Sequence, residues 1–182
     1  MSSDLTSPDS MGGTRGPGMS NVTRVFVAGP FWGLVDPRTG RMPIGERNRI
    51  ERLIEHFESK GCEVSNAHKR EAWGEEFLDP DIYTKVDFDE ISKADVLVAL
   101  PGNPVSPGTH VEIGWASALG KPIVLLVDPE KECAGLLRGL RTITNVEFVL
   151  VPEAAVDLGE LDEAVERMLQ PNYRGSGDVD IP

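Results

Sequence analysis

Two short, uninterrupted runs of apolar residues, VLVAL at 96–100 and IVLLV at 123–127, constrain the fold of this chain most strongly. A strand with one face in water alternates apolar and polar residues, whereas an unbroken run indicates burial on both faces. Strands of that kind belong to parallel sheets that helices cover on either side. The sequence therefore predicts an α/β protein, a doubly wound (Rossmann or flavodoxin-like) domain with a five-stranded parallel sheet and helices on both faces.

Strand and helix patterns alternate along the middle of the chain. Predicted strands cover 24–29, 62–67, 95–100, 122–127 and 145–151, and predicted helices cover 45–61, 82–94, 109–120 and 160–169. The segment 1–21 is rich in Ser, Gly, Pro and Asp and has almost nothing to bury, so we predict a disordered tail there. We expect one folded domain at 22–170 and a second tail at 171–182.

Composition argues against several classes of function. The 182 residues carry a net charge of −12, and a general nucleic-acid binder needs a basic face, so we expect no nucleic-acid partner. The two cysteines and three histidines have no metal-ligand spacing, which predicts no metal site and no disulfide. No apolar run approaches the roughly 18 residues of a membrane span, and residues 1–21 lack the apolar core of a secretory signal. We therefore expect a cytoplasmic protein without membrane association.

Ligands of doubly wound folds bind outside the carboxyl ends of the strands. That rule selects four segments: AGPFWG at 28–33, NAHKREAWG at 66–74, PGNPVSPGTH at 101–110 and DPEKE at 128–132. The first segment lacks the GxGxxG spacing of dinucleotide-binding loops, and neither GxxxxGK[ST] nor GxSxG occurs in the chain. The segments therefore favour carboxylates and an anion site, and we expect no cofactor.

Glu112, just after the third segment, has two interpretations. Thr109 and Glu112 match the [ST]-x-x-[DE] capping box, in which both side chains bond to free N–H groups at a helix start. Alternatively, the loop of Ser106, Gly108 and Thr109 presents its N–H groups to a phosphate. Glu112 would then lie in the first helical turn and be kept ionised by the helix dipole. An ionised carboxylate beside a sugar is what retaining glycosyl transfer requires.

Taken in order, the motifs resemble those of the nucleoside 2-deoxyribosyltransferase superfamily. VFVAGPF begins the match, a segment from Asp87 to Asp95 that ends in AD follows, and S-x-G-x-x-x-E-x-G-x-A spans Ser106 to Ala116. The resemblance covers roughly residues 24–150. It implies that Glu112 is the nucleophile that attacks the sugar C1′ and that Asp87 assists departure of the base.

Ser106 stands where two kinds of enzyme in this superfamily differ. The resemblance implies an acidic residue there in deoxyribosyltransferases, where it holds a free 5′-hydroxyl, and Ser in nucleotide N-glycosidases, where it binds a 5′-phosphate. A hydroxyl and nearby N–H groups bind a phosphate dianion that a carboxylate repels. The stretches LVDPRTG and NAHKREAWGEEF are also similar to the CMP and hydroxymethyl-CMP hydrolases of peptidyl-nucleoside antibiotic pathways.

The resemblance thus implies hydrolysis of the N-glycosidic bond of a pyrimidine nucleoside 5′-monophosphate through a glycosyl-enzyme on Glu112. The products are the free base and (deoxy)ribose 5-phosphate, and the identities of base and sugar stay open. Two alternatives remain, a deoxyribosyltransferase for free nucleosides and a non-catalytic nucleotide-binding domain. The residues expected to bind the substrate are Gly29, Pro30, Phe31, Ser106, Gly108 and Thr109.

Other features keep two interpretations each. Phe31 either stacks on the base or forms a hydrophobic lid or subunit contact, and the role of Trp32 is open. Residues 68–73 form a solvated polar loop unless His68 or Arg70 reaches the base. Asp87, Asp89 and Glu90, each taken alone, are read as solvated residues of a helix face, and Asp95 is expected to cap or pair locally. The superfamily generally forms homodimers or larger assemblies, so the resemblance also implies a homo-oligomer.

Overall fold

The computed structural model describes residues 22–102, 105–152, 156–170 and 173. Its strands are Arg24–Ala28 (β1), Glu63–Ser65 (β2), Val96–Ala99 (β3), Ile123–Val127 (β4) and Val146–Leu150 (β5). They form one sheet in the order β2-β1-β3-β4-β5, and every neighbouring pair is parallel. The predicted α/β fold with five parallel strands is confirmed, and its strand order is the flavodoxin-like one.

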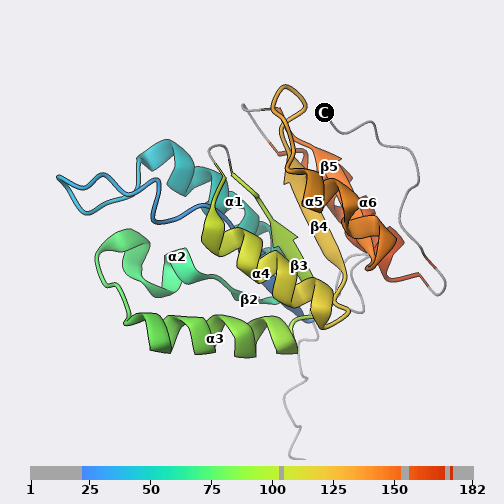
Figure 1. Cartoon of the computed structure of the whole chain (residues 1–182), viewed down its shortest axis with the longest axis horizontal. Helices are drawn as coiled ribbons and strands as arrows, with labels where there is room; N and C mark the ends of the chain where they lie inside the picture. The colour runs from blue at the N-terminus through green and yellow to red at the C-terminus, as the bar shows by residue number, and fades with distance from the viewer. Residues whose placement is uncertain (1–21, 103–104, 153–155, 171–172, 174–182) are drawn as a thin grey trace, which may run out of the picture.

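Helices cover both faces of the sheet (Figure 1). Ile44–Ser59 (α1) and Leu158–Met168 (α6) pack on one face. Pro80–Lys93 (α3), Pro107–Ala118 (α4) and Gly135–Gly139 (α5) pack on the other. The sequence patterns did not predict α5 or three very short helices, Ala67–Arg70 (α2), Ala72–Gly74 (η1) and Leu140–Thr142 (η2).

Neighbouring residues of each strand contribute to the two cores alternately. In β1, Val25 and Val27 face α1 and α6, whereas Phe26 and Ala28 face α3 and α4. All four side chains are at most 2% exposed. The apolar runs are unbroken because neither face of the sheet meets water. Burial on both faces is the property from which the parallel sheet was predicted.

The ends of the chain are described only in part. The predicted tail at 1–21 lies outside the described residues, and of the predicted tail at 171–182 only Tyr173 is described, packed against the core beside α1 and α6. Cys62 and Cys133 are buried, and the Cys62 thiol donates to the Val22 carbonyl at 3.6 Å. Among the described helices, none has the length and apolar character needed to cross a membrane.

Candidate functional site

A cavity of about 460 Å³ opens where the strands end, a volume in the range of small-molecule sites. All four loops selected from the sequence contribute to its wall, as does the N-terminal half of α1 through Glu46, Arg49 and Ile50. The cavity lies beside the β1 and β3 ends, where the strand order reverses, as expected for ligand sites in this fold. A cavity therefore lies where the sequence predicted the site, and that it binds a ligand stays a prediction.

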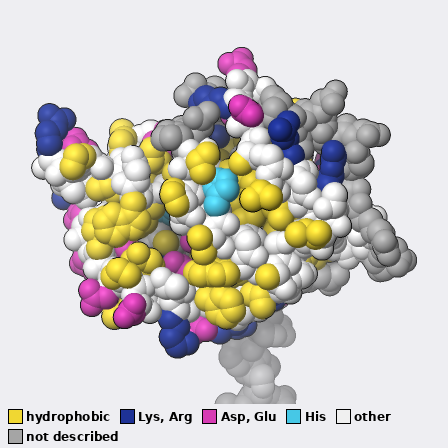
Figure 2. All heavy atoms as spheres, in the orientation of Figure 1, with side chains coloured by type: hydrophobic (Ala, Val, Ile, Leu, Met, Phe, Trp, Pro, Cys, Tyr) yellow, Lys and Arg dark blue, Asp and Glu magenta, His cyan; other side chains and the backbone are white. Residues whose placement is uncertain are grey.

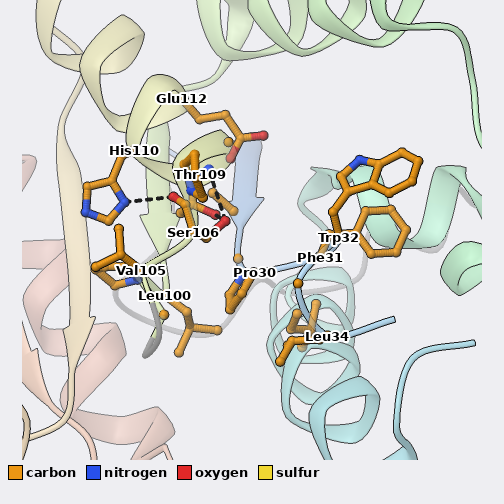
Figure 3. Close-up of a pocket in the computed structure, with 18 of the residues that line it drawn as sticks. Pro30, Phe31, Trp32, Leu34, Leu100, Val105, Ser106, Thr109, His110 and Glu112 are labelled. Carbon is orange, nitrogen blue, oxygen red and sulfur yellow. Dashed lines mark hydrogen bonds between the residues drawn. The ribbon is translucent and has the colours of Figure 1, made fainter. Parts of the chain in front are cut away.

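Ser106, not Thr109, caps α4. The helix begins at Pro107, and Ser106 Oγ accepts hydrogen bonds from the Thr109 N–H at 3.4 Å and the Thr109 hydroxyl at 3.0 Å (Figure 3). Glu112 consequently lies in the second turn of α4, beyond the N–H groups that a cap satisfies. The capping-box interpretation of Thr109 and Glu112 is therefore wrong, and the Glu112 carboxyl group is not needed to cap the helix.

The first turn of α4 has the properties of an anion site. Pro107 has no N–H group, and the Gly108 N–H lies in the turn whose N–H groups lack partners within the helix. A Cβ atom added at Gly108 would meet no heavy atom within 4 Å, so the cavity is open above this residue. The structure thus brings Ser106, Gly108 and Thr109 together at one wall of the cavity.

Glu112 and Asp87 line the same cavity, and burial dominates the electrostatics of both. Burial raises the pKa of Glu112 well above its usual range, the nearby Asp87 raises it further, and Arg70 opposes the shift. The predicted control by the helix dipole is wrong for two reasons. Glu112 lies in the second turn, where the dipole has weakened, and desolvation disfavours the charged form.

Arg70 connects Asp87 to a third carboxylate. Its Nη1 donates to Asp87 Oδ1 at 2.8 Å, and its Nη2 donates to Glu71 Oε1 at 3.2 Å. Burial raises the pKa of both Asp87 and Glu71, and the hydrogen bonds from Arg70 oppose that rise. Because Arg70 holds both carboxylates, the arginine and its two partners form one connected cluster, which we call the Arg70 cluster.

The sequence interpretation missed Glu71. Residues 68–73 were read as a solvated loop by default, and this is wrong for His68, Arg70 and Glu71, although Lys69 is exposed and pairs with Glu58. The dense run of charges around these residues is typical of a solvated loop. Position was the available signal, because the run follows a strand at the site end of the sheet.

His68 supports the loop after β1. Its Nδ1 accepts from Asn66 at 3.1 Å, and its Nε2 donates to the Pro30 carbonyl at 3.0 Å, which is the arrangement of a neutral imidazole. Burial lowers the pKa of His68 to about 4, so the ring stays neutral at physiological pH. A Cβ atom at Gly29 would meet Ile50 Cδ1 at 3.2 Å, so glycine permits close packing below this loop.

Aromatic side chains occupy the end of the cavity opposite Ser106 and Thr109 (Figure 3). Phe31 is 7% exposed and its ring centroid lies 4.5 Å from that of His68. Trp32 is 58% exposed and stacks on Phe77 at 3.8 Å. The structure therefore gives a buried apolar wall at Phe31 and an exposed aromatic pair at the mouth.

The remaining acidic candidates lie outside the cavity. Asp89 pairs with Lys85, and Glu90 accepts from Lys93 and from Ser65. Asp95 accepts from the backbone N–H groups of residues 23 and 24 at 2.8 and 2.9 Å. Both donors lie at the start of β1, far from Asp95 in the chain, so the prediction of a local cap or a local pair is wrong.

Comparisons with known proteins find a family and similar solved structures. The family model of nucleoside 2-deoxyribosyltransferase matches residues 43–162. The solved structure of Clostridium botulinum CMP N-glycosidase, BcmB, is 42% identical, with a TM-score of 0.58, over 78% of this chain and 99% of that one. The family model includes three of the four loops that line the cavity, at 66–74, 101–110 and 128–132, but not the loop at 28–33.

Two further solved structures are similar. The solution structure of BlsM is 50% identical, with a TM-score of 0.70, over 84% of this chain and 98% of that one. A conserved protein from Enterococcus faecalis V583 is 20% identical, with a TM-score of 0.56, over 81% of this chain and 99% of that one, and shares the fold alone. No curated protein sequence matches significantly.

Proposed function

Since the chain belongs to the nucleoside 2-deoxyribosyltransferase family, we propose that it is a nucleotide N-glycosidase that hydrolyses CMP or 5-hydroxymethyl-CMP. The family membership supports an enzyme of the N-glycosidase or glycosyltransferase type with a small nucleotide substrate. The solved relative at 42% identity is itself a CMP N-glycosidase, which supports the choice of substrate.

The observation that carries the proposal is the placement of Ser106 and Glu112 on one helix. Ser106 caps α4 at the wall of the cavity, and Glu112 lines the same cavity from the next turn. A 5′-phosphate at the first turn would hold the sugar at a fixed distance from the Glu112 carboxylate. Binding energy from the unreactive phosphate then orients C1′ for attack.

In the proposed reaction a Glu112 oxygen forms a bond to C1′ while the C1′–N bond breaks. The electron pair of the broken bond goes to the base, which takes a proton from Asp87. Water then attacks C1′, releases Glu112 and leaves the sugar 5-phosphate, and its proton returns to Asp87. Two neighbouring, poorly solvated carboxyl groups favour holding one proton between them, because two close negative charges repel.

The mechanism requires the shared proton to lie on Asp87 and not on Glu112 when attack begins. Burial raises the pKa of Glu112 strongly, whereas Arg70 favours the ionised form of Asp87. Attack needs the opposite arrangement, with Glu112 ionised and the proton on Asp87. The positive charge that develops at C1′ beside Glu112 favours this redistribution.

The two alternatives have weaker support. A deoxyribosyltransferase for free nucleosides is disfavoured by Ser106, which stands where the family resemblance implies an acidic residue. A non-catalytic nucleotide-binding domain would have no use for a buried Asp87 and a half-buried Glu112 at one cavity, because desolvating charge is costly. An acceptor assay with a free deoxynucleoside and a second base tests the first alternative.

The deciding experiment measures base release from CMP, hydroxymethyl-CMP, dCMP, UMP, AMP, GMP and cytidine by chromatography. We expect a cytosine-type monophosphate to be split and cytidine to be left intact. Glu112→Gln should release no base, and brief reaction of the wild type followed by acid quench should give a glycosylated peptide containing Glu112. Release of base by Glu112→Gln at the wild-type rate would refute the mechanism.

Three further expectations stay predictions. They are a homodimer or larger assembly, a cytoplasmic location and a place in peptidyl-nucleoside antibiotic biosynthesis. Hydrophobic side chains gather over α3 and α4 (Figure 2), among them Ile82, Phe88 and Val111, each at least 40% exposed. Such a surface suits contact with a second copy of the chain. The molar mass from light scattering tests whether the protein forms a homodimer or a larger assembly.

A further inference from the structure

The wall of the cavity is acidic, and the proposed substrate brings further negative charge into it. The carboxyl groups that line the cavity are those of Glu46, Glu71, Asp87, Glu112, Asp128 and Glu132. A phosphate monoester carries about −1.5 to −2 charges at pH 7. The Ser106 hydroxyl and the first N–H groups of α4 offer hydrogen bonds to such a group but supply only partial positive charges. A phosphate at this wall therefore requires a cation nearby.

Arg49 and Lys131 supply the lysine and arginine side chains of the described cavity wall. The Lys131 ammonium already pairs with the Asp128 carboxylate at 3.2 Å. Arg49 is half-buried, and its side chain has no ion pair or hydrogen bond with any residue that the structure describes. Its guanidinium nitrogens are not among the buried unpaired atoms of the described residues, so a ligand can reach them. The charge and the N–H donors of Arg49 are therefore available to a ligand in the cavity.

Arg49 approaches the cavity from the side opposite Ser106. α1 packs on one face of the sheet and α4 packs on the other, and both reach the cavity at the ends of the strands. The pKa of Asp128 is lowered, first by the bond from the Glu130 N–H and last by the charge of Arg49, which therefore lies near this carboxylate. Asp128 follows β4, whereas Ser106 follows the neighbouring strand β3. Arg49 and Ser106 thus border the same end of the cavity, where the phosphate is proposed to lie.

The helical spacing of α1 directs Arg49 to the cavity. Glu46, Arg49 and Ile50 stand at positions i, i+3 and i+4, which share one helix face, and all three line the cavity. Ile50 is 2% exposed, and a Cβ atom at Gly29 would lie 3.2 Å from its Cδ1, so close packing fixes this part of α1 against the loop after β1. A buried neighbour therefore holds Arg49 at the cavity, although its guanidinium group stays accessible.

We infer that the Arg49 guanidinium binds the 5′-phosphate of the substrate from the wall opposite Ser106 and thereby selects nucleotides over nucleosides. This inference rests on the proposed function and adds a residue to its binding site. Arginine presents its N–H donors in a planar fork that matches the oxygens of a phosphate. Ser106 and Arg49 then hold the phosphate between two helices, which keeps the sugar C1′ oriented toward Glu112.

The test measures the binding of CMP and of cytidine by calorimetry in the Glu112→Gln background, in which the proposed chemistry is blocked. The proteins compared are Glu112→Gln alone and the same variant carrying Arg49→Gln, Arg49→Lys or Arg52→Gln. Arg52 is the matched control, because it lies on the same helix, is exposed and stands outside the cavity wall. Near-ultraviolet circular dichroism verifies that each variant is folded. The KM for CMP of the single Arg49→Gln and Arg52→Gln enzymes gives the same comparison during turnover.

The inference predicts that Arg49→Gln weakens CMP binding about tenfold or more, because a hydrogen-bonded charge pair is lost. Arg49→Lys should weaken it less, and Arg52→Gln should leave it unchanged. Cytidine has no phosphate, so its affinity should be the same in all four proteins. Unaltered CMP affinity in folded Arg49→Gln, or an equal loss for CMP and cytidine, overturns the inference alone. Failure of Glu112→Gln to bind CMP, with no base release by the wild type, overturns the proposed function and this inference together.

Discussion

Arg70 donates a 2.8 Å hydrogen bond to Asp87. This contact gives the two carboxyl groups proposed for catalysis, Asp87 and Glu112, different electrostatic environments. Asp87 has a cation as a direct partner, so its charged form is supported despite burial. Burial and the charge of Asp87 raise the pKa of Glu112 by more than Arg70 lowers it. The protonation of Glu112 therefore depends on Asp87, and the dependence can be measured.

Asp87→Asn should move the pH dependence of Glu112. Activity requires ionised Glu112, so kcat/KM of the wild type should fall as the pH drops through the raised pKa of that group, above the usual range of glutamate. The substitution removes a negative charge that raises this pKa, so the acidic limb should move to lower pH. The maximal rate should fall roughly 10²- to 10⁴-fold because the proton donor is lost.

The control for this measurement is Asp89→Asn on the same helix, because Asp89 pairs with Lys85 outside the cavity. It should leave both the limb and the maximal rate unchanged. An acidic limb that stays in place in Asp87→Asn would show that the two carboxyl groups are not coupled.

Glu112→Gln should remove activity and stabilise the fold at neutral pH. Between the usual and the raised pKa of Glu112 the folded protein binds more protons than the unfolded chain, so stability falls as pH rises through that range. The neutral amide of the Glu112→Gln variant carries no charge to desolvate, so it does not lose stability as the pH rises. The melting temperature of Glu112→Gln should exceed that of the wild type at pH 8, and each 1 kcal/mol corresponds to roughly 2–4 °C. The difference should shrink at pH 5, and a lower melting temperature at pH 8 would contradict the effect of burial.

Ser106→Asp should reduce the use of monophosphates without unfolding the site. Aspartate caps helices as well as serine does, so α4 should keep its start, but the added charge repels a phosphate dianion. We expect kcat/KM for CMP to fall about 100-fold or more, with little change in melting temperature. Ser106→Ala should instead cost about 1 kcal/mol of stability through loss of the cap. Undiminished CMP cleavage by Ser106→Asp would place the phosphate elsewhere.

The sequence predicted the fold and the position of the cavity because both depend on short-range patterns. The unbroken apolar runs of β3 and β4 record burial on two faces, and the rule for strand ends then selected the four loops. The predicted helix boundaries differ from the observed ones by a few residues. The difference matters only in α4, where the cap is Ser106 and lies three residues before Thr109, so that Glu112 lies in the second turn.

The sequence could not predict the Arg70 cluster. Whether Arg70, Glu71 and His68 are solvated or buried depends on contacts with Pro30 and Asp87, which are distant in the chain. The pKa of Glu112 was misjudged for the same reason. A helix dipole can be inferred from sequence position, but desolvation depends on the walls of the cavity that the fold encloses.

His68 should titrate far below an ordinary histidine. Burial lowers its pKa from 6.5 to about 4, so folding is disfavoured as pH falls through that interval, in which the unfolded chain binds the extra proton. The interval corresponds to roughly 3 kcal/mol of folding free energy. An NMR titration of the His68 ring should give a midpoint near 4. A midpoint near 6.5 would mean that the Asn66 and Pro30 contacts do not keep the ring neutral.

Gly108→Ala and Gly114→Ala form a matched pair on α4 that separates substrate binding from helix stability. A Cβ atom at either residue would meet no heavy atom within 4 Å, and alanine favours a helix over glycine by up to about 1 kcal/mol. Of these two glycines, Gly108 lines the cavity and Gly114 does not. Both variants should therefore melt at or above the wild-type temperature, but Gly108→Ala places a methyl group where the phosphate is proposed to lie. Its KM for CMP should rise about tenfold or more, while Gly114→Ala keeps the wild-type value. If both variants retain that value, no part of the substrate approaches the first turn of α4, and the phosphate site must lie elsewhere in the cavity.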